Sequence, residues 1–358
     1  MNRKERRAAA KQSRSGKSKS ADLVAAKVQQ AIEMVQAGDL ADAEPLLDAA
    51  RRDAPDDPEV MHQLGMIYVR TGRSEPGIAL LKQSVELRPN ESLYWNNLAA
   101  AYLSVEMSEQ AVEAARKTVA LQPGYSMAWQ NLAFGLRDFA DHAGAVGAFE
   151  QSDKTGTLEP SSLASWGESL GILGRLAEGE QVVRRALVRA EEDPAILTLL
   201  GWLLVEQRKD AEAREVFKNS LELKPNQFLA AFNYGVLLLR KGETEAALRW
   251  LRRATSIDPK SAAAWRVLAL ELYRHGLREE ALPAAERSHR LAPDDAAINV
   301  LLEKLKATAP DQVDEVIDFS EPVPIGPEDA SDSAKRKKES GGSDDSGLLD
   351  FATINFGD

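Results

Sequence analysis

Histidines are the side chains in this sequence most suited to catalytic or metal chemistry. There are four, His62, His142, His275 and His289, and the chain has no cysteine. Acid–base catalysis and metal binding need such groups at characteristic spacings. None of the four has a ligand-spaced partner, and the phosphate-loop, dinucleotide, zinc-protease and nucleophile-elbow motifs are all absent. The sequence therefore predicts no catalytic residue, no metal site and no cofactor.

Adjacent carboxylates are the other candidates for chemistry. They occur at 56–57, 191–192 and 294–295, in connections between apolar segments. Carboxylates placed there stabilise the positive N-terminal end of the next helix, which explains them better than an acid/base pair does. We predict that the protein is not an enzyme.

The elements that carry these residues repeat along the chain. The same residue types recur 34 positions apart: Trp95, Asn97 and Leu98 are matched by Trp129, Asn131 and Leu132. Columns of small residues keep the same period through eight units, and prolines close most of them. The first such column is Ala31, Gly65, Ala99, Ala133, Gly167, Gly201, Gly235 and Ala269.

Each unit has two apolar-periodic segments separated by a turn, which predicts a pair of helices. Glycines 38, 72, 174, 242 and 276 supply the turn conformation. Small side chains at the crossing points let the helices approach closely, and the prolines end the second helix.

These columns resemble the tetratricopeptide repeat family. The family pattern is matched closely by "WNNLAAAYLSVEMSEQAVEAARKTVALQP" and "AWRVLALELYRHGLREEALPAAERSHRLAP", and the resemblance covers residues 24–295. It implies an all-α fold, a right-handed superhelical α-solenoid of eight helix-turn-helix repeats. "AAINVLLEKLKA" follows as a capping helix. The match is weakest near "DKTGTLEP", where either a bend or an unremarkable substitution explains the missing proline.

The resemblance also implies a concave groove lined by the first helix of each unit. The sixth position of that helix carries carboxamides in five units, which could clamp the backbone of an extended peptide. Aromatic and arginine side chains would add affinity. The predicted binding residues are Gln63, Arg70, Asn96, Asn97, Gln130, Asn131, Phe134, Arg137, Trp202, Phe232, Asn233, Arg240, Arg266, Tyr273 and Arg274.

Alternatives remain for parts of this site. Solvated amides are common on helices, and Trp202 and Phe232 fit equally well as core residues between repeats. The arginines of the later units favour an acidic, aromatic-containing ligand. No triplet of units carries the residues with which one subclass of the family clamps chaperone C-termini, which argues against a co-chaperone role.

Three regions are predicted: a basic disordered arm at 1–22, the repeat array with its cap at 23–308, and an acidic disordered tail at 309–358. The net charge is −11, yet residues 1–20 hold eight Lys/Arg against one Glu. Nucleic acid binding is therefore expected only through the arm. The tail carries two apolar motifs, at 316–325 and 348–356, and we hypothesise that they dock in the protein's own groove or on another protein.

These features predict a scaffold that binds an extended peptide or partner protein in its groove. The alternative is an accessory subunit of an enzyme or envelope-assembly complex, held through its convex or end surface. No stretch is long and apolar enough to span a membrane, and the N-terminus has no secretory signal. Together with the missing cysteines, this predicts a cytoplasmic protein.

Overall fold

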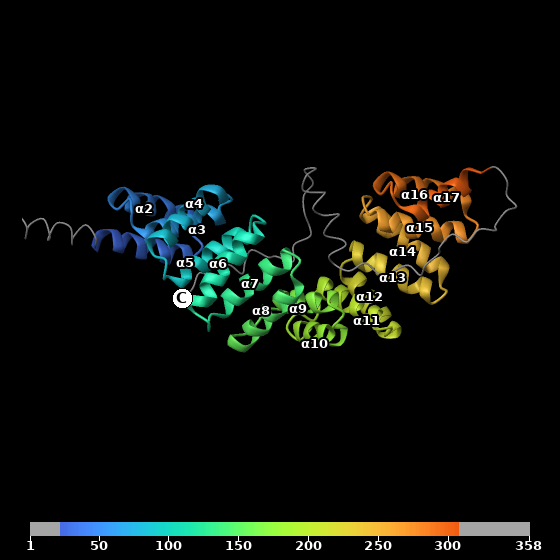
Figure 1. Ribbon diagram of the computed structural model, residues 1–358, viewed down its shortest axis with the longest axis horizontal. Coiled ribbons are helices and arrows are strands. Elements are labelled where there is room, and N and C mark those ends of the chain that lie inside the picture. Colours follow the sequence, from blue (N-terminus) through green and yellow to red (C-terminus); the bar gives the residue numbers. More distant parts are fainter. Residues whose placement is uncertain (1–21, 308–358) are drawn as a thin grey trace, which may run out of the picture. The chain divides into compact units, whose positions relative to one another are not determined.

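The computed structural model describes residues 22–307, and within that range every regular element is a helix. A helix over residues 22–36 pairs in sequence with α2 (Leu40–Asp53). The following pairs are α3 (Pro58–Arg70) and α4 (Ser74–Leu87), α5 (Ser92–Leu103) and α6 (Ser108–Leu121), α7 (Ser126–Asp138) and α8 (His142–Thr155), α9 (Pro160–Ile172) and α10 (Leu176–Leu187), α11 (Pro194–Glu206) and α12 (Asp210–Leu223), α13 (Phe228–Arg240) and α14 (Thr244–Ile257), and α15 (Ala262–Arg274) and α16 (Arg278–Leu291). A last helix, α17 (Ala296–Lys306), occupies the place of the predicted cap (Figure 1).

The predicted all-α architecture of eight helix pairs is confirmed. The described helices also fall into two larger compact bodies, each of several repeats. From here on we call them the first unit, which ends at Leu158 with α8, and the second unit, which begins at Glu159 with α9. The division lies in the irregular residues 156–159, where the closing proline is missing from the repeat pattern. The predicted arm and acidic tail lie outside the described residues.

Aspartate side chains cap the start of α3, α11 and α17. The side chain of Asp57 accepts hydrogen bonds from the backbone of Glu59 and Val60, at 2.9 and 3.2 Å. Asp193 and Asp295 cap α11 and α17 in the same way. These bonds satisfy amide groups that have no partner inside the helix. The acidic pairs at 56–57 and 294–295 therefore act as helix starts, whereas the pair at 191–192 precedes the capping Asp193.

The turn inside each repeat uses a left-handed backbone conformation at one fixed position. Five of these positions hold the predicted glycines, for example Gly72 at a φ of 81°. The other three hold Glu106, Ala140 and Arg208, at φ of 60°, 60° and 59°. This conformation crowds the Cβ of any residue other than glycine. The period of the repeat overrides the local preference at these three turns.

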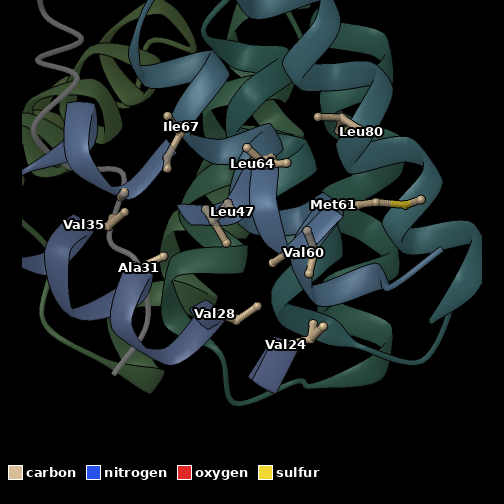
Figure 2. Close-up of a cluster of buried hydrophobic side chains, with 12 residues drawn as sticks. Val24, Val28, Ala31, Val35, Leu47, Val60, Met61, Leu64, Ile67 and Leu80 are labelled. Atoms are coloured by element: carbon tan, nitrogen blue, oxygen red, sulfur yellow. The ribbon is translucent and has the colours of Figure 1, made fainter. Parts of the chain in front are cut away.

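Packing within each repeat depends on close backbone contact. A Cβ on Gly65 would lie 2.9 Å from the carbonyl oxygen of Gly77, and a Cβ on Gly77 would lie 2.7 Å from that of Gly65. The columns of small residues thus mark the crossing of α3 and α4, as predicted. Around this crossing, apolar side chains of the first four helices form a continuous cluster that includes Val28, Leu47 and Leu64 (Figure 2).

Tryptophans join successive repeats by a recurring hydrogen bond. The indole nitrogens of Trp95, Trp129 and Trp265 donate to the carbonyl oxygen of the proline six residues earlier, at 2.8, 2.8 and 3.1 Å. Asn299 of α17 makes the same bond, at 3.0 Å. The proline carbonyls therefore anchor the next first helix, in addition to the role of proline in ending the previous one.

Candidate peptide-binding surface

Four polar side chains of the first unit form one hydrogen-bonded network across α3, α5 and α7. The Nδ2 atom of Asn97 lies 3.0 Å from Nε2 of His62. Asn96 donates to Oδ1 of Asn97 at 3.2 Å, and Asn131 donates to Oδ1 of Asn96 at 2.9 Å. Each link between helices spans 35 residues, which is one repeat plus one residue. The amides therefore connect neighbouring first helices to one another.

The network continues into a cluster of charged and aromatic groups. The ring of His62 stacks on Tyr94 with 4.3 Å between centroids. The Tyr94 hydroxyl donates to Glu59 at 2.6 Å, and Gln63 donates to the other oxygen of that carboxylate at 2.9 Å. Arg88 donates to the Tyr94 hydroxyl at 3.2 Å. This arrangement holds Glu59 ionised beside a buried imidazole.

Burial dominates the ionisation of this cluster. It lowers the pKa of His62 to about 4, against the attraction of the Glu59 carboxylate. Burial and the hydrogen bond to Glu59 raise the pKa of Tyr94. Burial alone would raise the pKa of Glu59, but hydrogen bonds from Gln63 and Tyr94 outweigh it and lower that pKa. His62 is therefore neutral at pH 7, and its Nδ1 atom is buried with no hydrogen-bond partner.

The amides differ from the predicted ladder of free donors. Asn96, Asn97 and Asn131 are 2%, 1% and 8% exposed, and Asn233 is 1% exposed. Asn97 and Asn131 lie against the preceding first helix and hydrogen-bond to its side chains, His62 and Asn96. Their part in ligand binding remains a prediction, and it now concerns a preformed network.

Two predicted aromatic contacts belong to the core. Phe232 is fully buried and stacks on Phe228, with 5.9 Å between centroids. Trp202 is 7% exposed, and its ring atoms lie 2.6 Å from where a Cβ on Gly171 would stand. The absence of a side chain at Gly171 makes room for the indole. Trp202 therefore packs between repeats and Phe232 lies in the core, which agrees with the alternative left open by the sequence.

Other predicted residues of the first unit remain partly accessible. Gln63, Phe134 and Arg137 are half-buried, whereas Arg70 is exposed and Gln130 is buried. The ring of Phe134 meets Phe149 edge-on at 5.5 Å, and the Arg137 guanidinium lies 5.4 Å from the Phe134 centroid. Arg137 also pairs with Asp138 at 2.7 Å. Phe134 therefore offers a held, partly exposed aromatic surface on the same helix as Asn131.

The predicted arginines of the second unit have carboxylate partners. Arg240 pairs with Asp210 at 2.9 Å, Arg266 with Asp295 at 3.2 Å and Arg274 with Glu271 at 3.0 Å. Tyr273 is half-buried, with the Arg278 guanidinium 5.7 Å from its ring centroid. Because these positive charges are compensated locally, the predicted preference for an acidic ligand at this site loses its support.

The sequence reasoning missed His62, Glu59 and Tyr94 as one cluster. The signal that identifies it is the offset of 35 residues, which relates Glu59 to Tyr94 as it relates His62 to Asn97. The described residues contain no cluster of three or more potential metal-ligating side chains. No helix in the described range is long and apolar enough to cross a membrane.

Comparisons with known proteins agree with this architecture. Sequence profiles described as tetratricopeptide repeat match residues 34–102, and also 165–228 and 198–262. No curated protein matches the chain.

Solved structures share the fold at low identity. The chain is similar to a structure titled as the APC/C hetero-tetramer Cut9-Hcn1, with a TM-score of 0.56 and 16% identity over 75% of this chain and 53% of that chain. It thus spans about half the length of that protein. It is also similar to a tetratricopeptide repeat protein from Parabacteroides merdae, with a TM-score of 0.51 and 16% identity over 70% of this chain and 99% of that one. The third is pilF of Pseudomonas aeruginosa, with a TM-score of 0.51 and 21% identity over 60% and 96%. The matched profiles therefore show tetratricopeptide repeats at residues 34–102 and 165–262, and the described helix pairs share the fold of solved proteins built from such repeats.

Proposed function

We infer that the protein is a non-catalytic interaction scaffold that binds an extended peptide or partner segment along the first helices of its repeats. The observation that carries this proposal is the amide network of α3, α5 and α7. Its last member, Asn131, donates to Asn96, but its own Oδ1 atom accepts no hydrogen bond from the described residues. The network therefore presents an acceptor that a peptide N–H can satisfy.

Comparison of equivalent repeat positions supports a role beyond packing. The position of Asn97 and Asn131 is occupied by Leu199 in α11 and Val267 in α15, and both of these are buried. Apolar side chains are thus sufficient to pack the array there. Burying an amide has a desolvation cost unless it is hydrogen-bonded. Amides occupy this position in the first helices of three successive repeats, α3, α5 and α7, which is consistent with a hydrogen-bonding function. The bonds of Asn97 and Asn131 within the network fix their orientation before a ligand arrives.

The neighbouring side chains suggest how such a ligand is held. Each hydrogen bond adds only about 0.5–1.5 kcal/mol, so amides alone bind an extended peptide weakly. The half-buried ring of Phe134, one turn along α7 from Asn131, supplies an apolar contact. We expect ligands with a backbone segment over the amides and an apolar side chain against Phe134.

Selection from a displayed library of random twelve-residue peptides on the full chain tests the proposal. The affinity of selected peptides is then measured for Asn131→Leu and Phe134→Ala, with circular dichroism to confirm folding. Asn219→Leu is the matched control, because Asn219 is an exposed amide on α12. Each test variant should lose about tenfold in affinity, and the control should lose none.

The opposite pattern would refute binding along the first helices. If the selected peptides bind Asn131→Leu as tightly as the wild type but lose affinity for Asn219→Leu, the outer surface is the binding surface. That outcome would favour the accessory-subunit alternative, in which a convex surface holds the partner.

A further inference from the structure

The outer sides of α14 and α16 concentrate arginine in an otherwise acidic protein. Arg249, Arg252 and Arg253 lie at spacings of three and four residues along α14, which places them on one stripe. Arg287 and Arg290 lie three residues apart on α16. All are exposed except Arg287, which is half-buried. We call these five side chains the arginine face.

Most of the arginine face has no compensating carboxylate. Arg252 pairs with Glu280 at 2.7 Å, and this bond links α14 to α16. Arg253 donates to the side-chain oxygen of Asn226 at 3.3 Å, and Arg287 donates to the carbonyl of Pro259 at 3.3 and 3.4 Å. Those partners are neutral.

The remaining two arginines have no partner of either kind. Among the described residues, Arg249 and Arg290 form no ion pair or hydrogen bond through their side chains. Even with Glu280 and Glu286 of α16 counted, the arginine face retains an excess of positive charge. Such a surface attracts an acidic segment of chain.

The sequence provides that segment in the same chain. Residues 311–332 contain eight Asp/Glu and no Lys/Arg, and they follow shortly after α17. The α17 helix packs beside α16, where Arg278 donates to the carbonyl of Lys304 at 2.8 Å. Twenty-two extended residues reach up to about 70 Å, several times the roughly 10 Å between neighbouring helices. A short tether of this kind also gives a high effective concentration.

We propose that the acidic segment 311–332 docks on the arginine face of α14 and α16. This contact lies on second helices, so it is separate from the peptide surface on the first helices. The acidic segment is then held on the outside of the repeats rather than over the amide network. The binding is electrostatic, and it weakens as salt rises because screening shortens the range of each charge.

Distance measurement between two spin labels tests the contact directly. The natural chain has no cysteine, so Ser256→Cys on the exposed surface of α14 and Ser320→Cys within the acidic segment can be labelled without competing thiols. Pulsed electron paramagnetic resonance at low salt should show a short, narrow distance population. That population should disappear in 1 M NaCl.

Charge reversal provides the decisive comparison. The triple variant Arg249→Glu, Arg253→Glu and Arg290→Glu should lower the ratio of docked to undocked segment by roughly tenfold, since each exposed ion pair contributes little alone. A matched triple, Lys82→Glu, Arg116→Glu and Lys117→Glu, makes the same charge change at exposed sites of α4 and α6 and should leave the ratio unchanged. Circular dichroism checks that both variants are folded.

Three outcomes would overturn the proposal. One is an equal loss in both triple variants, and another is an unchanged distance in the arginine variant. The third is a short distance that depends on protein concentration, which would assign the contact to a second copy. Reversing three acids of the segment to lysine in the arginine variant should restore docking. Asn131→Leu should leave the label distance unchanged, so failure of peptide binding is distinguishable from failure of this contact.

Discussion

Neutral His62 makes the stability of the first unit depend on pH. The imidazole is 1% exposed and has a pKa of about 4 in the folded protein, against about 6.5 in an unfolded chain. Between pH 6.5 and pH 4, the imidazole is therefore protonated in the unfolded state and neutral in the folded state. The contribution of neutral His62 to the unfolding free energy is present in full above pH 6.5 and is lost as the pH falls from 6.5 towards 4.

The size of the effect follows from that difference. A shift of roughly 2.5 pKa units corresponds to about 3 kcal/mol in total, of which about 2 kcal/mol is lost between pH 7 and pH 5. Other carboxylates also titrate at low pH. The quantity to measure is therefore the difference between the wild type and His62→Gln, whose amide has no charge to gain.

Urea unfolding followed by circular dichroism at several pH values gives the comparison. The wild type should lose about 2 kcal/mol more than His62→Gln between pH 7 and pH 5. His275→Gln, which replaces an exposed histidine, should follow the wild type closely. Parallel loss in the wild type and His62→Gln would show that burial of this imidazole does not govern the acid response.

Three further predictions concern the repeat framework. Ala140→Gly should stabilise the protein by about 0.5–1 kcal/mol in urea unfolding, because glycine relieves the left-handed turn at some entropic cost. The reverse change Gly147→Ala, at an exposed helical site with open space around it, should also stabilise the protein by about 1 kcal/mol. Destabilisation by both changes would contradict this reasoning. Trp129→Phe should lower the unfolding free energy by about 1 kcal/mol through loss of its indole hydrogen bond, and an unchanged midpoint would show that the bond is energetically neutral. Gly201→Ala should cost about 1–3 kcal/mol, measured as a lower melting temperature, because the added Cβ would stand 2.5 Å from the ring of Phe217.

The period of the sequence predicted the fold well because packing and turns recur at fixed positions. Small residues such as Gly65 and Gly77 are readable in a single sequence, since their spacing reflects the crossing of two backbones. The left-handed turns at Glu106 and Arg208 could not be read from residue type. These turns can be predicted only if the 34-residue period is given more weight than the conformational preference of the residue at the turn.

The binding surface was less predictable than the fold. The sequence placed amides at one repeat position, and the structure brings Asn96, Asn97 and Asn131 together with His62. It could not show that these groups bond to one another, because a 34-residue register aligns equivalent positions whereas contacts between first helices join residues 35 apart. The sequence also could not show which arginines are free to bind a ligand. Arg240, for example, was predicted to contact a ligand, but it forms an ion pair with Asp210.

The indole bonds also bear on how such an array comes apart. Trp95, Trp129 and Trp265 fasten three of the joints between repeats, whereas α9, α11 and α13 carry Leu163, Leu197 and Ala231 at that position. Joints without this bond use other contacts, such as the ion pair of Arg240 with Asp210 at 2.9 Å. Removal of the indole bonds should therefore lower the mechanical force at which the joints before α5, α7 and α15 open.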